Sequence, residues 1–148
     1  MCGELDENLQ INQEILQRFA AMAKALGVPA GTAKNDGVSG PQGLSNADGR
    51  AKYMDRLFNQ NLARCIADVE AVGEEETVDA IASQAIALAR LAGFVAGQLP
   101  PEADLFRTTI EALSEGHAEP KKIMEARRRE HDHHHGHGNE DGHGHHHH

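Results

Sequence analysis

Apolar residues recur at intervals of three and four along four stretches of this chain, and this spacing constrains its fold more than any other feature. In the first stretch, residues 4–26, the series consists of Leu5, Leu9, Leu16, Phe19, Ala23 and Leu26. Such spacing places apolar side chains on one face of an α-helix. Comparable series occupy residues 47–72, 75–98 and 101–116, so the sequence predicts four helices.

Glycine and proline mark the ends of the predicted helices. Gly27 and Pro29 follow the first helix, as a C-terminal glycine and a later proline commonly do. Residues 28–46 contain four glycines and two prolines among small and polar residues, which predicts a long loop. This loop is either a docking loop or a plain surface connection. It lacks the GxxxxGK[ST] pattern of a phosphate-binding loop.

The fold class follows from the composition and the short connections. The chain has no Trp, one Tyr and four Phe, and its apolar side is built from Ala, Leu, Ile and Val, which favours close-packed helices. Two of the three connections between the predicted helices are short. The sequence therefore predicts an all-α protein whose residues 1–117 form an antiparallel four-helix bundle.

The third helix should be buried in this bundle. Residues 80–99 are the most apolar stretch, but Gln84 and Arg90 lie within it and argue against a membrane span. Gly93 and Gly97 would permit close packing, either inside the bundle or at the seam of a homodimer. We also expect Cys65 to be a small buried apolar residue rather than a ligand.

The net charge and the first residues of the chain argue against some classes of partner and location. The formal net charge is −9, which argues against nucleic acid as a partner because phosphate binding needs a positive surface. The first residues, MCGELDENLQ, lack the pattern of a signal peptide, so we expect a cytoplasmic protein with no membrane partner and with reduced cysteines. Residues 118–130 are rich in Lys and Arg and are predicted to be a basic linker or a short helix.

The helical region offers no catalytic constellation. Di-iron centres in bundles use Glu-x-x-His pairs, but His117 is the one histidine before residue 118, and Ser114 stands three residues before it. We expect His117 to lie at a helix end, where the helix dipole favours it. One histidine cannot assemble a Ser/His/Asp or Cys/His site. The prediction is that the chain is not an enzyme.

The C-terminal segment 131–148, HDHHHGHGNEDGHGHHHH, contains ten of the eleven histidines of the chain. It has no apolar residue, so burial cannot offset the entropy of ordering it, and we expect it to be disordered. Acidic residues and glycines interrupt the histidines, which is typical of a native segment rather than of an engineered tag. The predicted metal ligands are His131, His133, His134, His135, His137, His143, His145, His146, His147 and His148.

Neutral imidazole suits divalent transition metals, and we expect nickel or zinc in preference to cobalt or copper. The segment resembles the His-rich tails of nickel metallochaperones, the accessory proteins of urease, hydrogenase and carbon monoxide dehydrogenase. That resemblance implies metal storage or delivery to a metalloenzyme or its maturation protein. It covers residues 131–148 alone, and the helical region carries no GTPase motif and no prolyl-isomerase pattern.

Two hypotheses follow. The first is a non-enzymatic metal-binding protein whose tail stores or delivers divalent ions, while the helices recognise a partner or form a homodimer. The second is a helical interaction or regulatory module whose His-rich tail is incidental or artificial.

Overall fold

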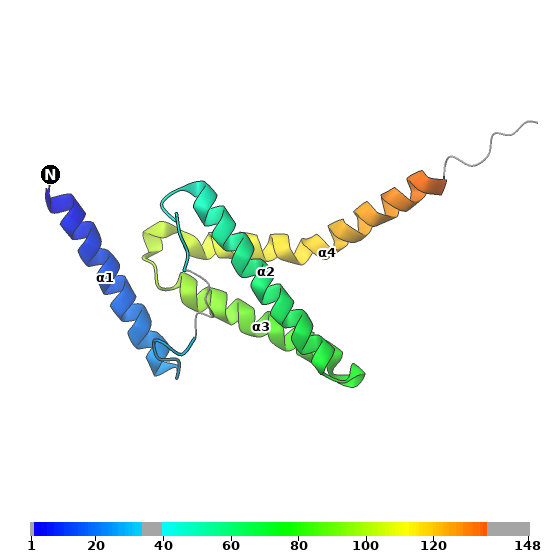
Figure 1. The fold of residues 1–148 in the computed structure, drawn as a ribbon, viewed down its shortest axis with the longest axis horizontal. Coiled ribbons are helices and arrows are strands. Elements are labelled where there is room, and N and C mark those ends of the chain that lie inside the picture. Colours follow the sequence, from blue (N-terminus) through cyan, green and yellow to red (C-terminus); the bar gives the residue numbers. More distant parts are fainter. Residues whose placement is uncertain (1, 34–39, 136–148) are drawn as a thin grey trace, which may run out of the picture. The chain divides into compact units, whose positions relative to one another are not determined.

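The structure is a computed structural model, and it describes residues 2–33 and 40–135. All regular structure in these residues is helical, which confirms the all-α prediction for this part of the chain. The helices are α1 (Cys2–Ala25), α2 (Ala47–Ala71), α3 (Thr77–Ala96) and α4 (Leu105–His135), with short 3₁₀ turns η1 (Glu74–Glu76) and η2 (Pro101–Ala103) (Figure 1).

The chain divides into two units, Met1–Leu105 and Phe106–His148, and each is described by itself. The first unit contains α1, α2 and α3, and the second contains α4 beyond its first residue. The predicted boundary at residue 117 falls inside α4.

The end of α1 is closed by the predicted glycine. Gly27 has a positive φ of 86°. The amide of Gly27 donates to the carbonyl oxygen of Lys24 at 2.9 Å, and the amide of Val28 donates to that of Ala23 at 2.9 Å. These two bonds form a Schellman motif, which satisfies carbonyl groups that the helix leaves unpaired.

The start of α2 is capped by Asn46, whose side-chain oxygen accepts a hydrogen bond from the amide of Gly49 at 2.8 Å. The segment that precedes α2 packs closely against this first turn. A Cβ atom at Gly49 would lie 2.0 Å from the carbonyl oxygen of Gly43, so position 49 admits glycine alone without rearrangement. The Arg50 guanidinium donates to the carbonyl oxygen of Leu44 at 3.0 Å and holds the same segment.

This close approach predicts opposite effects for two Gly→Ala substitutions. Gly49→Ala should lower the free energy of unfolding by about 1–3 kcal/mol, because the new methyl group overlaps the Gly43 carbonyl. Gly93→Ala should raise it by about 0.5–1 kcal/mol, since a Cβ there meets no atom within 4 Å and glycine is a poor helix former. Urea unfolding followed by circular dichroism measures both values. Equal effects of the two substitutions would contradict the close approach of the Gly43 carbonyl group to the first turn of α2.

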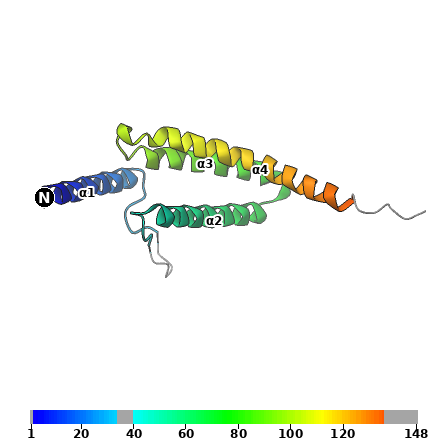
Figure 2. The ribbon, with the colours of Figure 1, turned by 90° about the horizontal axis from the view of Figure 1, so that it is seen from above.

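Contacts of different kinds join the helices of the first unit. α2 and α3 contact each other (Figure 2), and the side-chain amide of Gln84 donates to the carbonyl oxygen of Cys65 at 2.9 Å. The ring centroids of Phe19 and Phe94 lie 6.2 Å apart, which is within the range of favourable aromatic pairs. The Arg18 guanidinium donates to the carbonyl oxygen of Gln98, just after α3, where the helix dipole favours a positive charge.

The prediction that the third helix is buried is wrong for the described structure. Ala96 and Gln98 are the buried residues of the described chain. Ala96 is the last residue of α3, and Gln98 follows its C-cap. Gln84 faces α2, while Val78 and Ile86 on α3 are 76% and 72% exposed. α3 is therefore covered on part of its circumference only. Gly93 has open space around it, so the described residues provide no close internal packing at that glycine.

The segment Glu74–Ala96 is long and apolar enough to cross a bilayer by length and composition. The core helix of a soluble protein passes the same test, so this property alone does not assign a membrane span.

α4 differs most from its predicted extent. Gly116 does not end the helix, because α4 continues through Pro120 to His135. Pro120 has no amide hydrogen, so the carbonyl of Gly116 lacks its usual helical partner, and proline at such a position bends a helix without necessarily ending it. The ribbon of α4 changes direction partway along its length (Figure 1). His117 is consequently an exposed residue inside α4, and its predicted position at a helix end is wrong.

Candidate functional site

The His-rich segment begins inside α4. Residues 131–135, which were expected to be disordered, form the last turn of this helix. His131 and His133 are exposed there. His134 and His135 also belong to the helix, and His137, His143, His145, His146, His147 and His148 lie outside the described residues. The structure therefore places four of the ten predicted ligands on a helix and leaves the other six as predictions.

No group of three or more His, Cys, Asp or Glu side chains that could hold a metal ion occurs among the described residues. Cys65, a potential thiolate ligand on α2, is a half-buried free thiol, so the prediction that it is a buried residue is confirmed only in part.

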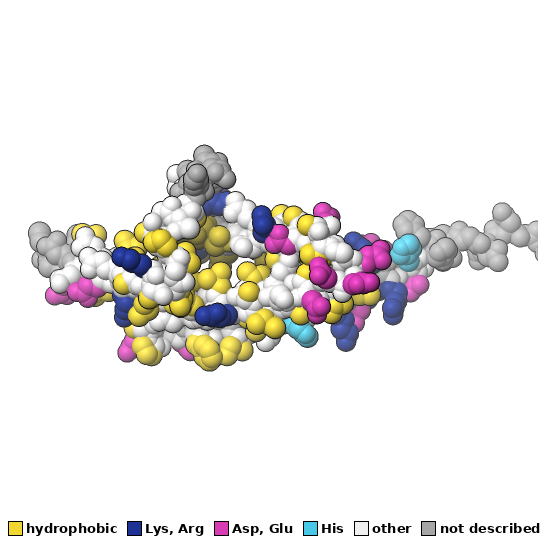
Figure 3. All heavy atoms as spheres, turned by 90° about the horizontal axis from the view of Figure 1, so that it is seen from below, with side chains coloured by type: hydrophobic (Ala, Val, Ile, Leu, Met, Phe, Trp, Pro, Cys, Tyr) yellow, Lys and Arg dark blue, Asp and Glu magenta, His cyan; other side chains and the backbone are white. Residues whose placement is uncertain are grey.

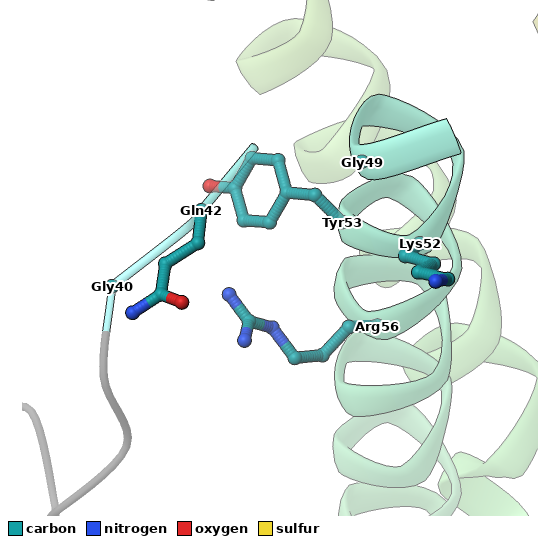
Figure 4. Close-up of a pocket in the computed structure, with 6 residues that line it drawn as sticks. All are labelled: Gly40, Gln42, Gly49, Lys52, Tyr53 and Arg56. Atoms are coloured by element: carbon teal, nitrogen blue, oxygen red, sulfur yellow. The ribbon is translucent and has the colours of Figure 1, made fainter. Parts of the chain in front are cut away.

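A polar concavity lies beside the first turns of α2 (Figure 4). It has a volume of about 270 Å³ and is lined by Gly40, Gln42, Gly49, Lys52, Tyr53 and Arg56. The Arg56 guanidinium carbon lies 5.4 Å from the centre of the Tyr53 ring, which is a cation–π distance. The Lys52 ammonium pairs with the Asp48 carboxylate at 3.0 Å.

The chemistry of this concavity does not match a metal site. The described residues of its lining carry two positive side chains, a phenol and an amide, and no carboxylate or imidazole. Lys52 is largely neutralised by Asp48, and both side chains are well exposed, so this ion pair adds little stability. The site suits hydrogen bonding to a small polar molecule.

A second concavity is an apolar groove between α1 and α3, with a volume of about 580 Å³. We call it the α1–α3 groove, and its lining consists of Phe19, Ala23, Leu26, Val28, Ala87, Arg90, Leu91, Phe94 and Val95. Among the described residues that line the groove, Arg90 is the one that carries a charge. The Phe19–Phe94 contact holds the two sides together, so the groove is a consequence of how α1 docks on α3.

Much of the apolar surface of the helices is exposed. Leu26 and Leu91 in the α1–α3 groove are 56% and 54% exposed, and large hydrophobic side chains on the other helices are similarly open. Figure 3 shows hydrophobic side chains over much of the face that it presents. Large exposed apolar surfaces of this kind mark sites of protein association in soluble proteins.

The sequence reasoning identified neither concavity. The spacing of Lys52 and Arg56, four residues apart on one helix, was a signal that two cations share a face. The α1–α3 groove had no local signal, because it depends on a contact between Phe19 and Phe94, which are far apart in the sequence.

Comparison with known proteins supplies no family for this chain. No family model, no curated protein and no solved structure matches it. The proposals below rest on its own residues.

Proposed function

We propose that this chain is a non-enzymatic protein that binds divalent metal ions through residues 131–148, for storage or for delivery to another protein. The observation that carries the proposal is the concentration of ten histidines in this segment. Imidazole nitrogen is a good ligand for nickel, zinc, cobalt and copper, and the resident ions proposed here are nickel or zinc.

The spacing of the histidines favours exchangeable binding. A structural zinc site holds four fixed ligands without surplus, whereas this segment offers many overlapping sets of three or four imidazoles. Ions bound in such sets can move between them and can pass to a recipient with a better-defined site. The resemblance of the segment to the tails of nickel metallochaperones supports a metalloenzyme or a maturation protein as the recipient.

The helical region has a supporting role in this proposal. The four apolar series support closure of the helices into an antiparallel bundle, in which each helix would cover the apolar face of another. The net charge of −9 disfavours nucleic acids as partners, and the location proposed for this metal-binding role is the cytoplasm.

Equilibrium dialysis of the full chain against Ni²⁺ or Zn²⁺ tests the proposal. We expect more than one ion per chain, and we expect a soluble chelator to remove all of them within the dialysis. A chain that retains no ion after dialysis would contradict metal binding, and a single ion that resists the chelator would indicate a structural site instead.

The α1–α3 groove favours a second candidate function, that of a helical interaction module. Its occupant in this candidate is a second copy of the chain. A stable interface takes about 800 Å² from each partner, and the groove is continuous with exposed apolar side chains such as Leu26 and Leu91 that a second copy would cover. A second copy brings an equal apolar surface, so both chains would be covered by one symmetric contact.

Light scattering on the full chain in the presence of EDTA tests this candidate. We expect a dimer that Leu91→Glu dissociates, with a loss of at least about tenfold in dimer affinity, because a carboxylate would be buried in the groove. Ile86→Glu is the matched control, since Ile86 lies on the same helix, is 72% exposed and does not line the groove. A monomeric wild-type chain, or a dimer that responds to Ile86→Glu alone, would contradict docking in the groove.

A further inference from the structure

The last turn of α4 brings histidines of the His-rich segment into a regular arrangement. α4 extends to His135, and His131 is exposed on it. An α-helix has 3.6 residues per turn, so positions 131 and 135 lie one above the other on the same face. Position 133 lies on a different face, and Arg129 and Glu130 are the residues four and three positions before it.

Two histidines four residues apart on a helix can bind one metal ion together, as in the metal-binding helices of zinc proteases. A pair that the helical form brings into register loses less conformational entropy on binding than a pair in an unordered segment, and the bound ion in turn favours the helical form of this last turn. The first ion should therefore prefer the helical pair.

The electrostatics of the helix end favour the same position. The unpaired carbonyl groups of the last turn give a helix C-terminus a partial negative charge, which attracts a bound cation. The formal charges over residues 125–132 balance, since Arg127, Arg128 and Arg129 are matched by Glu125, Glu130 and Asp132.

We propose that the first divalent ion binds between His131 and His135 and stabilises the last turn of α4. Metal occupancy and the helicity of this C-terminal turn are then coupled. The remaining histidines then take up further ions. This inference rests on the proposed function, because it names the first site within the same segment. This coupling would also let a partner protein distinguish the metal-bound chain from the metal-free chain, because the last turn of α4 would be better ordered in the metal-bound form.

Single substitutions in the full chain test the coupling with Zn²⁺ as the probe. His131→Ala and the matched control His133→Ala each remove one of the ten histidines, so they reduce total capacity equally. For the wild-type chain we expect the first equivalent of Zn²⁺ to increase the helical circular dichroism signal. In His131→Ala this increase should disappear and the first Kd, measured by calorimetry, should weaken at least about tenfold. His135→Ala should match His131→Ala, and His133→Ala should behave as the wild type.

The outcomes separate this inference from the proposed function. Zn²⁺ binding with no gain of helicity, or with equal effects of His131→Ala and His133→Ala, would overturn the helical site and leave metal binding by the segment intact. A wild-type chain that binds no Zn²⁺ would overturn both.

Discussion

Deletion of residues 131–148 is expected to remove nearly all Ni²⁺ and Zn²⁺ binding while leaving the remaining helices and their melting temperature almost unchanged. The deleted segment contains ten of the eleven histidines, and the described chain before it holds no cluster of three potential ligands. The segment has no apolar side chain, so its loss removes no hydrophobic burial. Calorimetric titration measures the metal capacity, and thermal circular dichroism measures the stability.

A change at the end of α4 is the one structural effect expected from this deletion. Five helical residues are lost, and the new helix end lies at Glu130, where a carboxylate is disfavoured by the dipole. The cost should be no more than about 1 kcal/mol, confined to this terminus. Several tight metal sites that persist after the deletion would place the chemistry in the helical region and contradict the assignment.

Acidification from about pH 7.5 to about pH 5.5 is expected to release most of the bound Ni²⁺ or Zn²⁺. Imidazole binds metal in its neutral form, and its reference pKa in water is about 6.5. Protonation therefore competes with metal over this interval. Because many histidines lie close together along the segment, each added proton disfavours the next, and the release should be broad rather than steep.

Metal titrations at the two pH values measure this release. A stoichiometry that is the same at about pH 5.5 and about pH 7.5 would show that exposed imidazoles are not the ligands.

The helices of the first unit were largely predictable because local signals define them. The apolar series located α1, α2 and α3 to within a few residues, and Gly27 ended α1 through the expected C-terminal geometry. The loop after α1 was also predicted, since its described residues form turns and irregular structure. The burial of these helices was not predictable, because it depends on which faces meet, and the spacing of apolar residues within one helix does not specify its neighbours.

The extent of α4 was mispredicted because two weak rules were given too much weight. Gly116 was treated as a helix end, and Pro120 as the start of a new segment. Neither residue is decisive within a run of good helix formers such as Lys121, Met124 and Glu125, so the helix continues to His135. The same error hid the helical arrangement of His131 and His135, which composition alone does not reveal.

X-ray absorption spectroscopy of the nickel-loaded full chain tests the central claim, that imidazoles of residues 131–148 bind the metal, most directly. The account predicts nitrogen ligands at about 2.0–2.1 Å with the multiple-scattering signature of several imidazole rings on each ion. A first shell of oxygen alone, or one that contains sulfur from Cys65, would contradict it.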